Sequence, residues 1–343
     1  MTNEVLARVE AAIFAIKAGK MVIMIDDEDR ENEGDLVYAA ALSTPQMVNF
    51  MVSEARGLVC VALEKRAAER LELSPMVAKN TSGHETAFTI SVDAASATTG
   101  ISARERHDTI ALLAQETSRA EDFARPGHIF PLIAKEGGVL ARIGHTEGAV
   151  DICRLAGVAP RGVICEIMNA DGTMSRRADL DKFAEKHNLP IVYIADLIEY
   201  RLLKERLVER VGSRRDRLFD SDVEVLEWRD HLGLIHRAIV FGEIGAGETQ
   251  VKFYAAGDSA ELLLNDRAFG GLLRAIERLK SGGGVLLLIA RGAAKGAAKE
   301  IGIGAQILAA IGARKIALLA TREFDPPPSL AAFGLEVARV ELL

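Results

Sequence analysis

The sequence predicts an α/β fold (α+β in the broad sense) built from two domains, and three observations lead to this prediction. Short apolar runs typical of buried strands alternate with amphipathic stretches typical of helices along the whole chain. The length of 343 residues corresponds to about two domains. A charged stretch separates two halves that differ in their expected pattern of strands and helices. We therefore expect a first domain at 1–203, a charged linker at 204–217 and a second α/β domain at 218–343.

Composition and charge are those of ordinary soluble proteins. Hydrophobic residues make up 49% of the chain and charged residues 27%, values typical of globular domains. The 42 Lys and Arg against 49 Asp and Glu give a net charge of −7 without a basic patch, so we expect no nucleic-acid partner. The apolar run 285–290 is too short to span a bilayer, so we expect no membrane association.

The N-terminus and the cysteines bear on the cellular location. The apolar side chains of residues 1–20 follow one face of a helix and do not form the continuous core of a signal peptide. The three cysteines (Cys60, Cys153 and Cys165) do not make a disulfide framework or a CxxC pair. Both features predict a cytoplasmic protein.

Periodicity and end signals predict the individual elements. Thr44 and Pro45 form the expected N-cap and first position of a helix, and Gly312 stands where a C-cap glycine belongs. The strands expected in the first half are 21–25, 36–40, 57–62, 87–92, 163–168 and 191–194. The helices expected there are 1–20, 45–54, 108–117, 145–156, 178–188 and one from about 197. The second half is expected to hold strands 238–242, 285–290 and 315–320 and helices 263–279 and 303–311.

The acidic stretch 26–35 (DDEDRENEGD) is the most unusual feature of the sequence. Seven of its ten residues are carboxylates, and it directly follows the apolar run 21–25. Like charges this close repel one another, which lowers stability unless a cation or water neutralises them. A charge run is most often a solvated turn. Here the buried strand before it and Gly34 within it favour an ordered, functional loop.

Two histidines and a glutamate in the same half are further candidates for a functional site that includes this loop. His145 follows a glycine at an expected helix start, where free N–H groups attract phosphate or another anion. Taken alone, His145 and His128 are each more simply capping or packing residues. Glu166 lies inside an apolar strand, where a carboxylate is costly unless it is paired or functional. Together the groups suit a divalent cation with acid and base groups around a small oxygen-rich substrate.

Several common site motifs are absent from the sequence. The EF-hand pattern fails because, counted from Asp27, position six is Asn32 and position twelve is Tyr38. The chain has no HExxH, no GxSxG, no Walker A sequence and no GxGxxG after a strand.

Five segments resemble the signature segments of 3,4-dihydroxy-2-butanone 4-phosphate synthases, in the same order, over residues 1–203. They are 26–35, TTGISA at 98–103, RPGH at 125–128, GHTE at 144–147 and CEIMN at 165–169. The family usually has Asp where this chain has Glu105, which keeps the charge and lengthens the side chain.

This resemblance implies an α/β/α synthase domain that converts ribulose 5-phosphate to 3,4-dihydroxy-2-butanone 4-phosphate and formate in riboflavin biosynthesis. It implies that Glu31 and His145 hold Mg²⁺ or Mn²⁺ and that His128 and Glu166 serve proton transfer. It also implies a homodimer with active sites at the subunit interface. The substrate-binding residues that it implies are Arg30, Glu31, Asp35, Arg142, Ile143, Gly144, His145, Thr146 and Glu166.

The second half resembles the end of GTP cyclohydrolase II, through GIGAQIL at 302–308 and GARKI at 312–316. The catalysis of that enzyme needs three zinc-binding cysteines. The corresponding stretch 260–271 contains none, and residues 290–296 replace the usual RQEGRG segment. Without thiolate ligands there is no tetrahedral zinc and no activated water. We therefore expect no zinc and a cyclohydrolase-like domain without cyclohydrolase activity.

Three other interpretations stay open. One is a bifunctional enzyme that also opens GTP, against which the missing cysteines argue. Another gives residues 210–343 a regulatory role in binding a nucleotide or a partner, which is compatible with a lyase in the first half. A third treats the acidic loop as a cation-binding module without catalysis, which would leave His128 and Glu166 without a role.

Overall fold

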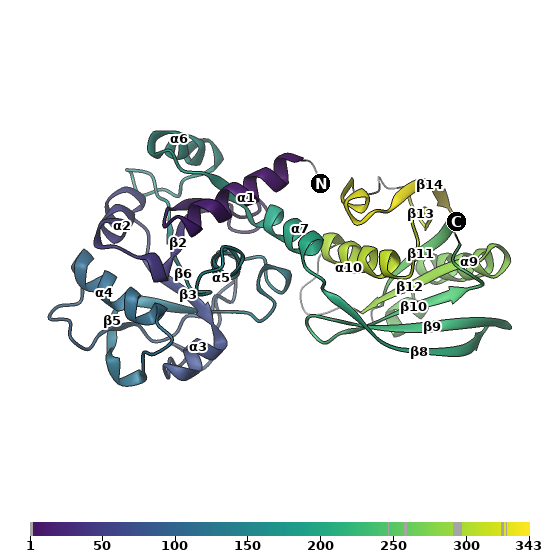
Figure 1. The fold of residues 1–343 in the computed structure, drawn as a ribbon, viewed down its shortest axis with the longest axis horizontal. Coiled ribbons are helices and arrows are strands. Elements are labelled where there is room, and N and C mark those ends of the chain that lie inside the picture. Colours follow the sequence, from purple (N-terminus) through teal and green to yellow (C-terminus); the bar gives the residue numbers. More distant parts are fainter. Residues whose placement is uncertain (1–2, 246, 257–258, 291–296, 324–325, 327) are drawn as a thin grey trace. The chain divides into compact units, whose positions relative to one another are not determined.

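The computed structural model describes residues 3–245, 247–256, 259–290, 297–323, 326 and 328–343. The chain divides into two compact units, residues 2–198 and residues 199–343. Each unit is built on one seven-stranded sheet with helices packed against it (Figure 1). The predicted α/β class is therefore confirmed. No helix of the described residues is long and apolar enough to cross a membrane.

The sheet of the first unit has the strand order β4-β5-β3-β6-β2-β1-β7. Its strands are β1 (Val22–Ile25), β2 (Gly34–Ala39), β3 (Cys60–Glu64), β4 (Val92–Ala94), β5 (Phe123–Ala134), β6 (Gly162–Glu166) and β7 (Ile191–Tyr193). Its helices are α1 (Asn3–Lys17), α2 (Pro45–Phe50), α3 (Lys65–Arg70), α4 (Ala103–Ala114), α5 (His145–Leu155) and α6 (Arg177–His187), and α7 (Ile194–Lys204) contains the boundary between the units. Four single turns complete it: η1 (Ala40–Leu42), η2 (Met51–Ala55), η3 (Ala120–Asp122) and η4 (Gly138–Leu140).

Helices cover both faces of this sheet. Alternate strand residues such as Leu36 and Val61 join Val48 of α2 and Ile110 of α4 in one buried cluster. The opposite face packs against α5 and α1. The close approach of α5 depends on a small residue, since a side chain at Gly148 would overlap Met24 of β1. Helix α5 thus lies directly over the central strands β6 and β2, which sets the position of its N-terminus above the sheet.

Most expected elements of the first unit are present, but strand β5 and helix α3 were not predicted, and two predicted elements differ in extent. Thr44 caps α2 as predicted, accepting a hydrogen bond from the Met47 amide. Helix α4 begins five residues before the predicted start because the Ser102 side chain caps it at the Glu105 amide. The strand predicted at 87–92 is reduced to β4, preceded only by isolated bridges.

The sheet of the second unit has the order β14-β13-β11-β12-β10-β9-β8, in which the first four strands are parallel. Its strands are β8 (Val208–Leu218), β9 (Ser221–Asp230), β10 (Ile235–Phe241), β11 (Glu248–Ala256), β12 (Gly284–Ala290), β13 (Lys315–Ala320) and β14 (Glu336–Leu342). Its helices are α8 (Ser259–Leu263), α9 (Asp266–Gly282), α10 (Ala297–Ala310) and the short η5 (Pro328–Phe333). Gly312 has φ +90°, in agreement with its predicted role after α10.

Two findings in this unit bear on the predictions. Leu286 packs in a cluster with Leu279 of α9, whereas Leu287 lies beside Gly304 of α10, so the two helices cover opposite faces. Residues 208–217 of the expected linker form edge strand β8, paired with β9. The linker prediction is wrong for these residues. Most side chains of this edge strand are exposed and charged, so its sequence resembles that of a linker. Residues 291–296, where the replaced segment falls, lie outside the described residues.

Candidate active site

A pocket of the first unit lies where β1 ends, β2 begins, β6 ends and α5 begins. The acidic loop joins β1 to β2, and the first residue of α5 is His145. The sheet thus brings the acidic stretch and the GHTE segment together although more than a hundred residues separate them. The residues that line the pocket are Arg30, Glu31, Glu33, Asp35, Cys60, Thr86, Phe88, Leu132, Arg142, His145, Thr146, Ile164 and Glu166.

Asp26 folds the acidic loop. Its buried carboxylate accepts the backbone N–H of Glu33 at 2.8 Å and that of Glu31 at 3.2 Å. The same carboxylate receives Arg30 Nη1 at 2.8 Å, and Arg30 also contacts Glu31 at 2.5 Å. One carboxylate and one guanidinium therefore order the loop, and the carboxylate of Glu31 is left facing the pocket.

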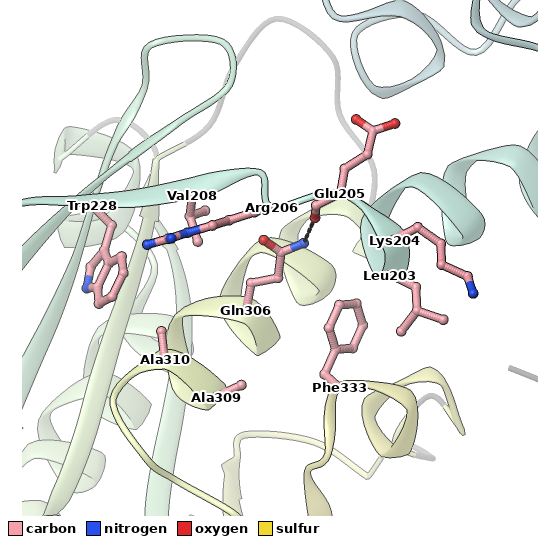
Figure 2. Close-up of a pocket in the computed structure, with 10 residues that line it drawn as sticks. All are labelled: Leu203, Lys204, Glu205, Arg206, Val208, Trp228, Gln306, Ala309, Ala310 and Phe333. Atoms are coloured by element: carbon pink, nitrogen blue, oxygen red, sulfur yellow. Dashed lines mark hydrogen bonds between the residues drawn. The ribbon is translucent and has the colours of Figure 1, made fainter. Parts of the chain in front are cut away.

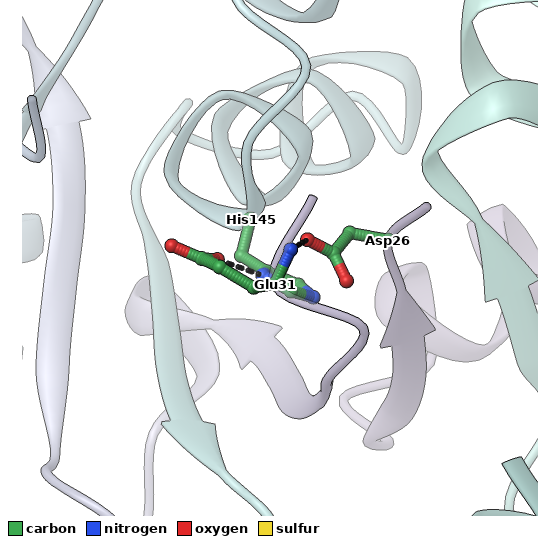
Figure 3. A group of neighbouring side chains, drawn as sticks. All are labelled: Asp26, Glu31 and His145. Carbon is green, nitrogen blue, oxygen red and sulfur yellow. Dashed lines mark hydrogen bonds and ion pairs between the residues drawn. The ribbon is translucent and has the colours of Figure 1, made fainter. Parts of the chain in front are cut away.

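Glu31 meets His145 in the pocket (Figure 3). Glu31 Oε2 lies 3.6 Å from His145 Nδ1. One ligand atom from each of Asp26, Glu31 and His145 lies within 4.8 Å of the other two, close enough for a single metal ion. Both oxygens of Asp26 already accept hydrogen bonds within the loop, so Glu31 and His145 are the members of this group that line the pocket.

Burial and neighbouring charges strongly shift the pKa values of the pocket's ionisable groups. Burial alone would raise the pKa of Glu31, but His145 and Arg30 lower it to about 2. Burial raises the pKa of Asp35 to about 8, and the nearby Glu166 adds to the effect. Burial would lower the pKa of His145, but Asp35 and Glu31 outweigh it and raise it to about 9. Several carboxyl groups thus crowd one imidazole, an arrangement that a bound cation would stabilise.

Two buried atoms in the pocket have no hydrogen-bond partner among the described residues. They are Asp35 Oδ1 and His145 Nε2, which lie 3.9 Å apart. A buried polar atom without a partner is costly in a folded protein. A mixed imidazole and carboxylate donor set suits Mn²⁺, and Mg²⁺ would keep several waters there. The residues present therefore fit a divalent cation with an oxygen-rich ligand.

Arg142 is held at the wall of the pocket by Glu147. Glu147 is 1% exposed, and its Oε2 accepts Arg142 Nη1 at 2.6 Å. Arg142 Nη2 donates to the carbonyl oxygen of His84 at 2.8 Å and to Thr86 Oγ1 at 3.2 Å. These contacts fix a cation beside the N-terminus of α5, a combination that attracts phosphate.

The remaining predicted substrate residues divide into two groups. Thr146 lines the pocket, whereas Gly144 and Ile143 do not line it. Gly144 is the N-cap of α5, where a side chain would overlap Arg142. Ile143 has 46% of its surface exposed. Close packing thus explains the glycine at position 144, and of these three residues only Thr146 lines the pocket.

Glu166 and His128 lie in different places. Glu166 stands opposite Asp35 in the β2–β6 register, and its Oε2 accepts the Leu58 N–H at 2.8 Å. His128 lies on β5 and is not among the residues that line the pocket. Its side chain is 43% exposed and its Nδ1 lies 2.7 Å from Asp93 Oδ2. Within one chain, therefore, only Glu166 of the two predicted catalytic residues reaches the pocket.

Comparison with known proteins agrees with this geometry. The family model for 3,4-dihydroxy-2-butanone 4-phosphate synthase matches residues 10–200, more than half of the chain. Proteins of that name from Sulfurospirillum multivorans and Wolinella succinogenes are 50% and 52% identical to it, over 98% and 97% of this chain and 95% and 96% of theirs. The chain belongs to the 3,4-dihydroxy-2-butanone 4-phosphate synthase family.

Solved structures add the two-unit architecture. A crystal structure of a two-domain 3,4-dihydroxy-2-butanone 4-phosphate synthase from A. baumannii has a TM-score of 0.84 and 42% identity, covering 98% of both chains. A synthase in complex with two magnesium ions has a TM-score of 0.54 and 40% identity, and covers 56% of this chain and 95% of its own. The chain is thus an enzyme of the synthase family with an additional unit.

Three residues important to this synthase-family site were missed by sequence reasoning. In the sequence Asp26 is one carboxylate of a charge run, and only the structure shows that it folds the loop. Glu147 belongs to the GHTE segment, but the sequence does not show that it holds Arg142. Asp93 carries no sequence signal, because its importance comes from pairing with His128, 35 residues away.

Proposed function

We propose that this enzyme converts D-ribulose 5-phosphate to L-3,4-dihydroxy-2-butanone 4-phosphate and formate, a reaction of riboflavin biosynthesis, in the cytoplasm. The observation that carries the proposal is the approach of Glu31 and His145 within a pocket that Arg30, Arg142 and Glu166 also line. Abstracting a proton beside a ketone needs a base near carbon and an electrophile near the carbonyl oxygen. The pocket offers both kinds of group.

Glu31 and His145 would hold Mg²⁺ or Mn²⁺, which when bound polarises the substrate oxygens. A relative solved in complex with two magnesium ions supports the choice of Mg²⁺. Arg142 would bind the substrate phosphate, since Glu147 already holds its guanidinium beside the N-terminus of α5.

The other residues of the pocket would orient the sugar. Arg30 and Thr146 would donate to its hydroxyl oxygens, and Asp35, whose pKa burial raises to about 8, would both accept and donate near neutral pH. Glu166, held by the Leu58 amide, would move a proton within the pocket.

His128 would act from a second copy of the chain. It is a half-exposed imidazole on β5, outside the pocket that holds Glu166. A homodimer that brings His128 of one subunit to the pocket of the other would complete the active site. This arrangement agrees with the interface sites that the family resemblance implies.

The test is formate release from ribulose 5-phosphate by the full-length protein with Mg²⁺, together with identification of the four-carbon phosphate product. We expect His128→Ala and Glu166→Ala proteins each to be inactive. If the active site is shared between subunits, mixing the two variants restores part of the activity, because the mixed dimer contains one intact site. A folded, Mg²⁺-supplemented wild-type protein that releases no formate would refute the proposal.

For the second unit we propose a GTP cyclohydrolase II-like fold without cyclohydrolase activity. Its pocket at the end of α7 is lined mainly by apolar groups, among them Trp228, Ala310 and Phe333 (Figure 2). Gln306 lines it too, but its amide is used by the fold, donating to the carbonyl oxygens of Leu202 and Glu205. The test is zinc content and turnover of GTP: stoichiometric zinc with GTP opening would favour a bifunctional enzyme. Binding of GTP without turnover would favour the regulatory alternative.

A further inference from the structure

A single buried carboxylate holds both the backbone and the ring of His128. Asp93, on β4, is 8% exposed. Its Oδ1 accepts the backbone N–H of His128 at 2.9 Å, and its Oδ2 lies 2.7 Å from His128 Nδ1. Two contacts from one side chain fix the position of the residue and the rotation of its imidazole.

Two glycines allow the surrounding backbone to pack closely against this pair. The α-carbon of Gly127 lies against the backbone of Val92 and Asp93, and a methyl group there would overlap both. Gly100, with φ +76°, lies against the Asp93 carboxylate and the His128 ring. Neither position has room for a side chain, so the glycines of the RPGH and TTGISA segments are explained by the packing of the Asp93–His128 pair.

The loop that carries Gly100 is itself fixed by Glu105. The Glu105 carboxylate accepts the N–H and the hydroxyl of Thr98, both at 2.7 Å, and the hydroxyl of Thr99 at 3.0 Å. The Glu105 side chain thus reaches the loop from the first turn of α4. The loop is held against the Asp93–His128 pair from outside.

The contact also selects the tautomer of His128. An ionised carboxylate only accepts hydrogen bonds, so Nδ1 must carry the proton that it shares with Asp93. In the neutral ring, Nε2 is then the free acceptor, and no described residue hydrogen-bonds to it. Since the side chain is 43% exposed, this nitrogen is accessible to an incoming group.

We propose that Asp93 is a positioning residue that holds His128 in the Nδ1–H tautomer and so presents Nε2 as the proton acceptor toward substrate. The inference rests on the proposed lyase function. It assigns a role to a residue that touches no substrate in the pocket of its own chain. The strand that carries Asp93 is irregular at this point, since the β4–β5 register shifts between Val92 and Asp93.

The deciding variant is Asp93→Asn, which keeps the size of the side chain and the acceptor for the His128 amide. The new NH₂ group donates to Nδ1, so the ring proton moves to Nε2. We expect kcat to fall about a hundredfold or more, the scale of a lost general base, with KM changed less than about threefold. The matched control is Asp230→Asn, which alters a buried Asp–His pair of the second unit and leaves formate release unchanged.

A second readout does not depend on activity. In Mg²⁺-loaded protein labelled with ¹⁵N-histidine, at about pH 8 where an ordinary imidazole is neutral, wild-type His128 should show a protonated Nδ1 and a bare Nε2. The Asp93→Asn protein should show the reverse. An Nε2-protonated ring in wild type, or a reversed tautomer with unchanged kcat, would overturn the inference. If wild type makes no formate but shows the expected tautomer, the lyase proposal fails and the positioning contact stands.

Discussion

Both units of this chain bury a histidine against a carboxylate, and the two pairs differ in what surrounds them. In the first unit His145 lies with Glu31 and Asp35 in a pocket, where Nε2 and Asp35 Oδ1 lack hydrogen-bond partners among the described residues. In the second unit Asp230 Oδ2 lies 3.3 Å from His236 Nε2, which also lacks a hydrogen-bond partner among the described residues. There, however, Asp230 Oδ1 accepts two backbone N–H groups and His236 Nδ1 accepts the Ala290 N–H, so the second pair mainly holds backbone in place.

The comparison teaches that a buried histidine beside a carboxylate does not by itself mark a site, even when one of its polar atoms is unpaired. In the first unit a third possible metal ligand lies beside the histidine and the glutamate. Within the described part of the second unit, no three His, Cys, Asp or Glu side chains gather closely enough to hold a metal ion. The two units share layers of helices on a seven-stranded sheet. The units differ in the side chains that lie at the ends of their strands.

We expect the largest effect on formate release when a carboxylate of the pocket is replaced, compared with the same replacement on the surface of the second unit. Glu166→Gln keeps an oxygen to accept the Leu58 N–H, so the fold should persist while proton transfer is lost. We expect formate release to fall about a hundredfold or more. Glu224→Gln in β9, an exposed residue of the second unit, is the control and should leave the rate unchanged. A Glu166→Gln enzyme within fivefold of wild type would remove Glu166 from the mechanism.

Core truncations should act on one unit at a time. Leu36 and Leu287 are both 0% exposed, and replacing either by Ala should cost its own unit about 2–5 kcal/mol. The chain has a single tryptophan, Trp228, so its fluorescence reports the second unit. In urea, Leu287→Ala should shift the fluorescence transition, and Leu36→Ala should shift only the loss of activity. Equal shifts of both signals by either variant would show that the units unfold together.

Acid should weaken the first unit through Glu105. Hydrogen bonds from Thr98 and Thr99 lower the pKa of Glu105 to about 2, from 4.5 in the unfolded chain. A depressed pKa gives stability that is present above pH 4.5 and is lost as the pH falls toward 2. The urea midpoint of the activity loss should therefore fall less between pH 6 and pH 3 in Glu105→Gln than in wild type. Parallel pH profiles for the two proteins would contradict this account.

The smallest expected effect comes from removing the second unit. Solved synthases that cover 56% of this chain with 95% of their own length correspond to the first unit alone. A chain ending at Lys204 loses the hydrogen bond from Gln306 to Leu202 at the end of α7. We expect its formate release to stay within about threefold of wild type. A larger loss would assign the second unit a role in the activity or assembly of the first.

The sequence predicted those parts of the site that depend on local pattern. Glu31, Asp35, Arg142, His145 and Glu166 all line one pocket, as their place in the motifs suggested. The acidic stretch could be recognised because a charge run after a buried strand conflicts with stability unless it has a function. Helix starts such as Thr44 could be predicted equally well, because capping depends on residues that are neighbours in the sequence.

What could not be predicted depends on contacts between distant segments. His128 shares its motif set with Glu166, yet strand order places it outside the pocket. Asp93 gains its role from a strand 35 residues later in the chain. The β8 strand was mistaken for a linker because an exposed edge strand and a solvated linker share the same charged composition.

The most direct test of the central claim is metal-dependent formate release by full-length wild type, compared with Glu31→Gln. We expect formate from ribulose 5-phosphate with Mg²⁺, its loss in EDTA and its return when excess Mg²⁺ is added. Glu31→Gln should remain folded and release no formate at the same Mg²⁺ concentration. Formate release that survives EDTA, or a fully active Glu31→Gln enzyme, would contradict the assignment of Glu31 and His145 as the cation site.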